Sequence, residues 1–97
     1  MLTGKQKRYL RSIAMTMEPI QQIGKDGIGD NLIKQLDETI EVRELIKVKI
    51  LKNSSEEVHD AGERLSQALK ADLVQTIGHC IVLYRKSEKK PKLELPK

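Results

Sequence analysis

Aromatic side chains are nearly absent from this sequence. The 97 residues include two tyrosines, Tyr9 and Tyr84, and neither Trp nor Phe. Sheets that stack several nucleobases on exposed rings need more aromatic residues than this, so the sequence argues against that class of nucleic-acid-binding protein. Tyr84 could stack a single base, but its place in an apolar strand pattern favours a buried or half-buried ring.

Cysteine and long apolar runs are scarce as well. Cys80 is the only cysteine, so an internal disulfide is impossible and a reducing compartment is expected. No segment is apolar enough over its length to span a membrane, and the N-terminus lacks the apolar core of a signal peptide. We therefore expect a cytoplasmic protein without a membrane partner, and its length predicts one domain.

Residues suited to catalysis or metal binding are few. A metal site needs three or four convergent ligands, and His59, His79 and Cys80 do not form such a set in the sequence. Cys80 with one histidine also lacks the third group that orients a nucleophile pair. We predict that the protein is not an enzyme and uses no metal or cofactor. His79 and Cys80 are interpreted as a turn residue and a small strand residue.

Charged side chains make up 33% of the chain, and the basic excess lies toward its two ends. The formal net charge of +4 divides into +2 for residues 1–30, −1 for residues 31–70 and +3 for residues 71–97. This distribution is compatible with a polyanionic partner such as nucleic acid. Many small proteins without such partners are also mildly basic, so charge alone leaves the partner open.

Hydrophobic periodicity predicts three helices and four strands. Thr3 to Gln6 and Ser54 to Glu57 both have the pattern of a capping box, so we expect a helix to begin at each. The predicted helices are residues 3–15, 30–42 and 54–69, and the predicted strands are residues 19–23, 45–51 and two within 72–85 joined by a Gly78-His79 turn. Residues 87–97 are basic and contain prolines, which predicts a loose tail.

The order α-β-α-β-α-β-β predicts an α/β fold with a single mixed four-stranded sheet packed with helices. A strand–helix–strand unit favours parallel strands and a right-handed crossover, and the last two strands form an antiparallel hairpin. In the second predicted strand, apolar side chains alternate with Lys47 and Lys49. The sheet face opposite the second and third helices is therefore expected to be at least partly solvent-exposed.

Gly24, Lys25, Asp26 and Gly27 form a GxxG loop between the first predicted strand and the second predicted helix. The glycines lack the Cβ atoms that would keep a ligand away, Lys25 adds a cation, and the helix N-terminus presents free N–H groups, so the loop could hold a phosphate. Neither a Walker motif nor GxGxxG is present, which argues against a nucleotide site. On these four residues alone, a plain turn with positive φ is the more common explanation.

Four stretches of the chain together resemble one family. They are LTGKQKRYLRSIA, IGKDGI, ELIKVKIL and VQTIGHCIVLYR, in this order. The chain is similar to the CRM domain, the chloroplast RNA splicing and ribosome maturation domain, and particularly to its stand-alone bacterial YhbY form. The resemblance covers residues 2–86 and implies a fold like the C-terminal domain of translation initiation factor three. Gly29 stands where many relatives have a Thr helix cap, and we expect Asp30 to cap the helix instead.

The resemblance implies RNA binding and association with precursors of the large ribosomal subunit. It places the family's GxxG motif on Gly24, Lys25, Asp26 and Gly27, and it suggests a CRM-type domain over residues 1–86 with a basic tail over 87–97. Further candidate RNA contacts are Lys7, Arg8, Arg11, Lys47 and Lys49. The alternative for each is a solvated surface residue without a role in binding. We expect the protein to be a monomer and also to contact ribosomal proteins. The alternative function is a protein-interaction adaptor that docks on a ribosomal protein or an assembly GTPase.

Overall fold

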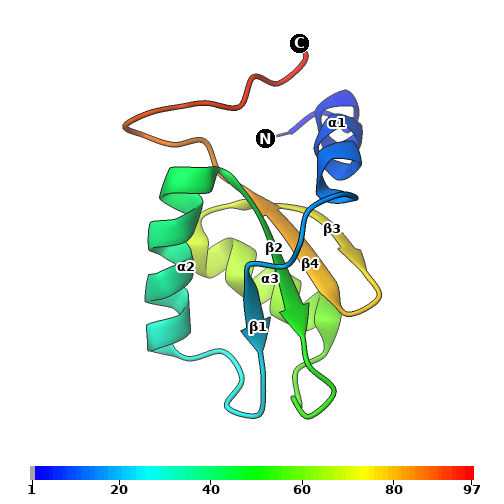
Figure 1. Cartoon of the computed structure of the whole chain (residues 1–97), viewed down its shortest axis with the longest axis vertical. Coiled ribbons are helices and arrows are strands. Elements are labelled where there is room, and N and C mark those ends of the chain that lie inside the picture. Colours follow the sequence, from blue (N-terminus) through cyan, green and yellow to red (C-terminus); the bar gives the residue numbers. More distant parts are fainter. Residues whose placement is uncertain (1) are drawn as a thin grey trace.

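Three helices and one four-stranded sheet make up the computed structural model, which describes residues 2–97 (Figure 1). The helices are α1 (Gly4–Ala14), α2 (Asp30–Arg43) and α3 (Val58–Leu69), and the strands are β1 (Gln21–Ile23), β2 (Leu45–Ile50), β3 (Asp72–Ile77) and β4 (Cys80–Tyr84). The strand order is β1-β2-β4-β3, with β1 parallel to β2 and the other pairs antiparallel. The predicted α/β fold with a mixed sheet is confirmed. No helix within residues 2–97 has the length and apolarity needed to cross a membrane.

The first two helices begin where the sequence predicts, but the second has a different cap. The capping box of α1 is confirmed, because the Gln6 N–H donates to Thr3 Oγ1 at 3.1 Å and the Gln6 side chain accepts the Thr3 N–H at 3.0 Å. The N-cap of α2 is Gly29, whose extended backbone has no side-chain cap, so the prediction that Asp30 caps this helix is wrong. Asp30 lies in the first turn instead, where its negative charge suits the positive end of the helix dipole.

The third helix begins later than the sequence predicted. Ser54 and Glu57 do not form a capping box; Glu57 is itself the N-cap, and its side chain accepts the His59 N–H. The Ser54 hydroxyl accepts the N–H of Glu56 at 3.2 Å, a short-range bond that competes with helix formation. The segment before Val58 is therefore a loop, and the Glu56 side chain is free to contact another part of the protein.

The main hydrophobic core lies between α2, α3 and one face of the sheet, which we call the back face. Apolar side chains of β1, β2 and β4 meet the apolar stripes of the two helices, and each buried Leu or Ile contributes roughly 1.5–3 kcal/mol. The fully buried members include Ile23, Leu36, Ile40, Ile46, Val48, Leu65, Leu69, Ile81 and Leu83. The alternation predicted for β2 is confirmed by this arrangement.

The opposite face of the sheet, the front face, is covered over only part of its area. A second core forms there between α1, the ends of β2 and β4, and the C-terminal segment, with Leu10, Ala14, Leu45, Val82 and Tyr84 buried. Beyond this core, Lys49 is exposed on β2. The prediction that the face carrying the lysines is partly solvent-exposed is therefore confirmed, although α1 covers one end of it.

The C-terminal tail is packed against the protein, so the expectation of a loose tail is wrong. The carboxylate of Glu44 is fully buried and accepts N–H groups from Ser87 at 2.8 Å, Lys92 at 2.7 Å and Leu93 at 2.8 Å. Leu93 and Leu95 pack on the second core. Figure 1 shows the tail returning across the end of the molecule where α1 lies. The lysines and prolines of the tail predicted a loose segment. Nothing in the sequence indicated its packing, because the carboxylate that binds the tail, Glu44, lies 43 to 49 residues before the N–H groups that it accepts.

Candidate nucleic-acid interface

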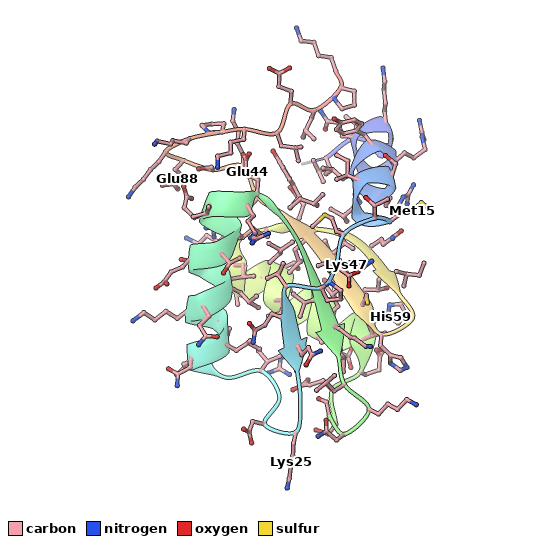
Figure 2. The ribbon with its side chains drawn as sticks, in the orientation of Figure 1. Met15, Lys25, Glu44, Lys47, His59 and Glu88 are labelled. Carbon is pink, nitrogen blue, oxygen red and sulfur yellow. The ribbon has the colours of Figure 1, made fainter. Side chains whose placement is uncertain are left out.

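The GxxG loop forms one end of the molecule. Its turn is closed by the Gly27 N–H, which donates to the Gly24 carbonyl at 3.1 Å. Gly27 has φ +69°, a conformation that side-chain-bearing residues rarely adopt, whereas Gly24 has no positive φ. Lys25 and Asp26 are exposed, and Figure 2 shows Lys25 pointing away from the protein at the tip of the loop. The plain turn with positive φ therefore accounts for Gly27 but not for Gly24.

A carboxylate from another loop reaches into the GxxG loop. Glu56 Oε2 accepts the Ile28 N–H at 3.3 Å, and Glu56 Oε1 pairs with Arg64 Nη1 at 2.8 Å. A Cβ atom on Gly27 would lie only 2.7 Å from Glu56 Oε2, so the end of the Glu56 side chain would have to shift to admit one. A protein oxygen thus already holds the Ile28 N–H, which lies in the loop just before the N-cap of α2. The loop itself offers an anion the ammonium group of Lys25, and α2 begins without a side-chain cap on its first N–H groups.

The first helix has a strongly basic surface. It carries Lys5, Lys7, Arg8 and Arg11 and no acidic residue. Arg8 is exposed and Lys7 and Arg11 are half-buried, and none of the three forms an ion pair within residues 2–97. Like charges three or four residues apart destabilise a helix by roughly 0.2–0.5 kcal/mol per pair. A helix that keeps such a cluster without neutralising it is suited to a negatively charged partner.

The two lysines of β2 differ in their surroundings. Lys47 is half-buried, and its Nζ donates to the Ala14 carbonyl at 3.2 Å and the Met17 carbonyl at 3.3 Å, so it holds the C-terminal end of α1 against the sheet. Lys49 is exposed and forms no ion pair in the described part of the chain. The alternating pattern could not separate these two roles, because it carries no information about what covers the front face.

The structure also places a cation near the GxxG loop that the sequence analysis did not select. Lys52 is exposed in the loop after β2. This loop lies beside the GxxG loop, because a Cβ atom on Gly24 would lie 3.6 Å from Leu51 and 3.8 Å from Asn53. The parallel pairing of β1 and β2 brings the carboxyl ends of both strands to the same edge. That pairing was predicted, so the proximity of the two loops could have been inferred from it.

The candidate contacts do not form one compact cluster. The molecule measures 39 × 27 × 21 Å, and Figure 2 shows Lys25 at one end of its long axis, α1 near the other end and Lys47 between them. Basic and acidic residues are concentrated on different layers of the molecule. The first helix carries four cations and no acid, whereas α2 and α3 together carry six acidic and three basic residues. An anionic partner is therefore favoured on the front face and disfavoured on the helical layer behind it.

The other polar candidates are accounted for by packing. Tyr84 is buried on β4, as expected, and its pKa is raised by burial and further by the nearby carboxylates of Glu44 and Asp72. His59 Nδ1 lies 2.8 Å from the Thr76 hydroxyl. Within residues 2–97, no three His, Cys, Asp or Glu side chains are grouped so that they could hold a metal ion.

Comparison with known proteins gives a family and several similar chains. The family model of the CRS1/YhbY (CRM) domain matches residues 2–85. "Probable RNA-binding protein YqeI" of Bacillus subtilis is 53% identical over 96 residues, which cover 99% of this chain and 100% of that protein. "Probable RNA-binding protein MJ0652" of Methanocaldococcus jannaschii is 39% identical over 105 residues, covering 99% of this chain and 78% of that protein. The solution structure of the hypothetical protein SAV1595 from Staphylococcus aureus is 55% identical, with a TM-score of 0.82 over 99% of this chain and 100% of that one.

Proposed function

Because this chain belongs to the CRS1/YhbY (CRM) domain family, we propose that it is an RNA-binding protein that acts on the rRNA of large-subunit precursors. The family resemblance found in four stretches of the sequence is confirmed by the match over residues 2–85. Relatives from Bacillus subtilis and Methanocaldococcus jannaschii are named as RNA-binding proteins, which supports RNA as the partner. The observation that carries the proposal is the separation of charge between the basic α1 side and the acidic helical layer.

The proposed contact surface, which we call the basic path, runs along the front of the molecule from α1 to the GxxG loop. Its cations are Lys7, Arg8, Arg11, Lys49 and Lys25. Each can pair with one phosphate and release a counterion, which makes binding depend strongly on salt. The ammonium group of Lys47 is already bonded to two carbonyls, so in this proposal it contributes chiefly by holding α1 in place.

The two glycines of the loop have different roles in this proposal. A Cβ atom on Gly24 would have only ordinary van der Waals neighbours, at 3.6 Å or more, and φ is not positive. The fold therefore does not require glycine here, and in this proposal the missing side chain lets RNA approach the backbone. Gly27 keeps the loop in shape, with Glu56 as its partner. Asp26 is exposed beside Lys25 and would face away from a bound phosphate, because like charges repel.

Folded rRNA fits this surface better than an unstructured strand read base by base. The chain has two tyrosines; one is buried and Tyr9 is 40% exposed on α1, so bases have almost no rings on which to stack. Selectivity must then come from the shape of the RNA backbone. A maturing large subunit offers folded backbone of this kind, and the family resemblance implies the same partner.

Sedimentation of tagged protein from a bacterial lysate tests this proposal. At low salt we expect the protein to sediment with large-subunit precursors and to be scarce on translating ribosomes, and high salt should release it. Neutralising α1 with Lys7→Gln, Arg8→Gln and Arg11→Gln should move the protein to the top of the gradient.

The matched control removes the same number of charges from the other side of the molecule. Lys34→Gln, Lys70→Gln and Lys89→Gln change exposed residues of α2 or of segments beside the helical layer, and this variant should stay with the precursors. Unsubstituted protein that remains at the top at low salt would contradict the proposal. Attachment that survives high salt and digestion of the RNA would favour the adaptor function instead.

A further inference from the structure

Four side chains form a row across the uncovered half of the front face, and we call them the open row. The strand register pairs Gln22 on β1 with Lys49 on β2, Lys49 with Cys80 on β4, and Cys80 with Ile77 on β3. Side chains of paired residues project from the same face of a sheet, so these four lie side by side. The row therefore crosses all four strands.

The open row is accessible and contains no acidic group. Gln22 and Lys49 are exposed, Ile77 is 59% exposed and Cys80 is half-buried. The neighbouring position on β2 toward α1 is Lys47, whose Nζ is bonded to α1 and to the segment that follows it. The first helix and the tail thus cover the rest of the front face, and the open row is the part of the sheet that remains between them and the GxxG loop.

The position of the open row decides what can occupy it. The basic path has cations at both ends of a molecule 39 Å long, and Lys49 is its only uncommitted cation on the sheet itself. A polyanion that contacts Lys25 and α1 together must pass over the front face, because the layer behind the sheet has six acidic residues against three basic ones. The neutral side chains on both sides of Lys49 let a negatively charged backbone approach without repulsion.

Building on the proposed function, we propose that one RNA strand crosses the open row, with a phosphate on Lys49 and a ribose packed against Ile77. The row has no aromatic ring, so the contact is made with the sugar–phosphate backbone and not by base stacking. An exposed apolar side chain is ordinary by itself, and Ile77 gains significance from its place in the same row as Lys49, with Cys80 between the two. The sheet thereby joins the two basic ends into one continuous site.

The single cysteine of the chain provides a direct test. Cys80 is alkylated with N-ethylmaleimide, an uncharged reagent that RNA does not repel, in the presence and absence of saturating deproteinised large-subunit rRNA, and modification is followed by mass spectrometry. Bound RNA should slow alkylation at least fivefold. Because Cys80 is half-buried, the measurement is repeated on Gln22→Cys in a Cys80→Ser background, which puts the reporter at an exposed point of the row. Alkylation at the free rate in protein that is fully RNA-bound would overturn the inference.

A pair of matched substitutions gives a second, independent readout. Ile77→Asp and Val42→Asp each add one negative charge at an apolar residue of nearly equal exposure, 59% and 61%, but Val42 lies on α2 and not on the open row. We expect Ile77→Asp to weaken rRNA binding about tenfold and Val42→Asp to change it less than twofold, with thermal melting confirming that both fold. Equal affinities would refute the path over the sheet. Failure of the unsubstituted protein to bind rRNA would instead refute the proposed function, so the two outcomes are distinguishable.

Discussion

Replacing Gly27 by alanine should destabilise the protein, whereas the same change at Gly24 should not. Gly27 has φ +69°, and a left-handed backbone costs a residue with a Cβ roughly 1–2 kcal/mol. The new Cβ would also lie 2.7 Å from Glu56 Oε2, so the carboxylate must move away from the Ile28 N–H, at a further cost of about 1 kcal/mol. We therefore expect Gly27→Ala to lower the free energy of unfolding by about 2–3 kcal/mol.

Gly24 is the matched comparison within the same loop. An added Cβ would meet Leu51 at 3.6 Å and Asn53 at 3.8 Å, which are ordinary contacts, and φ is not positive. Alanine at such a position restricts the unfolded chain, so the change should be neutral or stabilising by up to about 1 kcal/mol. Effects of Gly24 substitutions on RNA binding can then be measured in a protein whose fold is unchanged.

A double-mutant cycle separates the two costs at Gly27. In a Glu56→Ala background the carboxylate is gone, so Gly27→Ala should cost only the backbone part, about 1–2 kcal/mol. Urea unfolding followed by circular dichroism measures all four proteins. Equal effects of alanine at Gly24 and Gly27, or the same cost at Gly27 with and without Glu56, would show that the contact between the two loops does not shape the GxxG turn.

Two further predictions concern charge. For single-stranded RNA each phosphate contact contributes about −0.7 to the slope of log K against log salt. The variant with Lys7, Arg8 and Arg11 replaced by glutamine should therefore flatten that slope by about two units in a filter-binding titration. An unchanged slope would show that α1 does not contact the RNA. Glu44→Gln should destabilise the fold by about 1–3 kcal/mol and expose the tail to trypsin, because at least one of the three N–H groups loses its acceptor. Burial raises the pKa of Glu44, but the three N–H donors and Lys86 together lower it by more. The net effect is a pKa below the ordinary value. The stability that Glu44 provides is therefore complete above its ordinary pKa of 4.5 and is lost as the pH falls through the lowered folded value, so denaturation below pH 4.5 should be less steep in Glu44→Gln than in the unsubstituted protein.

Local patterns were sufficient to predict the elements and their order. The capping box at Thr3, the stripe of α1 and the alternation in β2 depend on residues within a few positions of one another, so they can be recognised without the fold. The family motifs are also continuous stretches. For these reasons the mixed sheet and the two helices behind it were predicted, and the structure agrees with them.

Only the tertiary structure decided what each charged residue contacts. Glu56 reaches the Ile28 N–H across 28 positions, Lys47 bonds to Ala14 across 33, and Glu44 binds the Leu93 N–H across 49. Such pairs have no local signature, because a side chain's partner depends on which segments pack together and not on spacing along the chain. The sequence alone determined that the protein has a basic helix and a glycine loop; the packing of α1 and the tail over the sheet determined that these lie at opposite ends, with the open row between them.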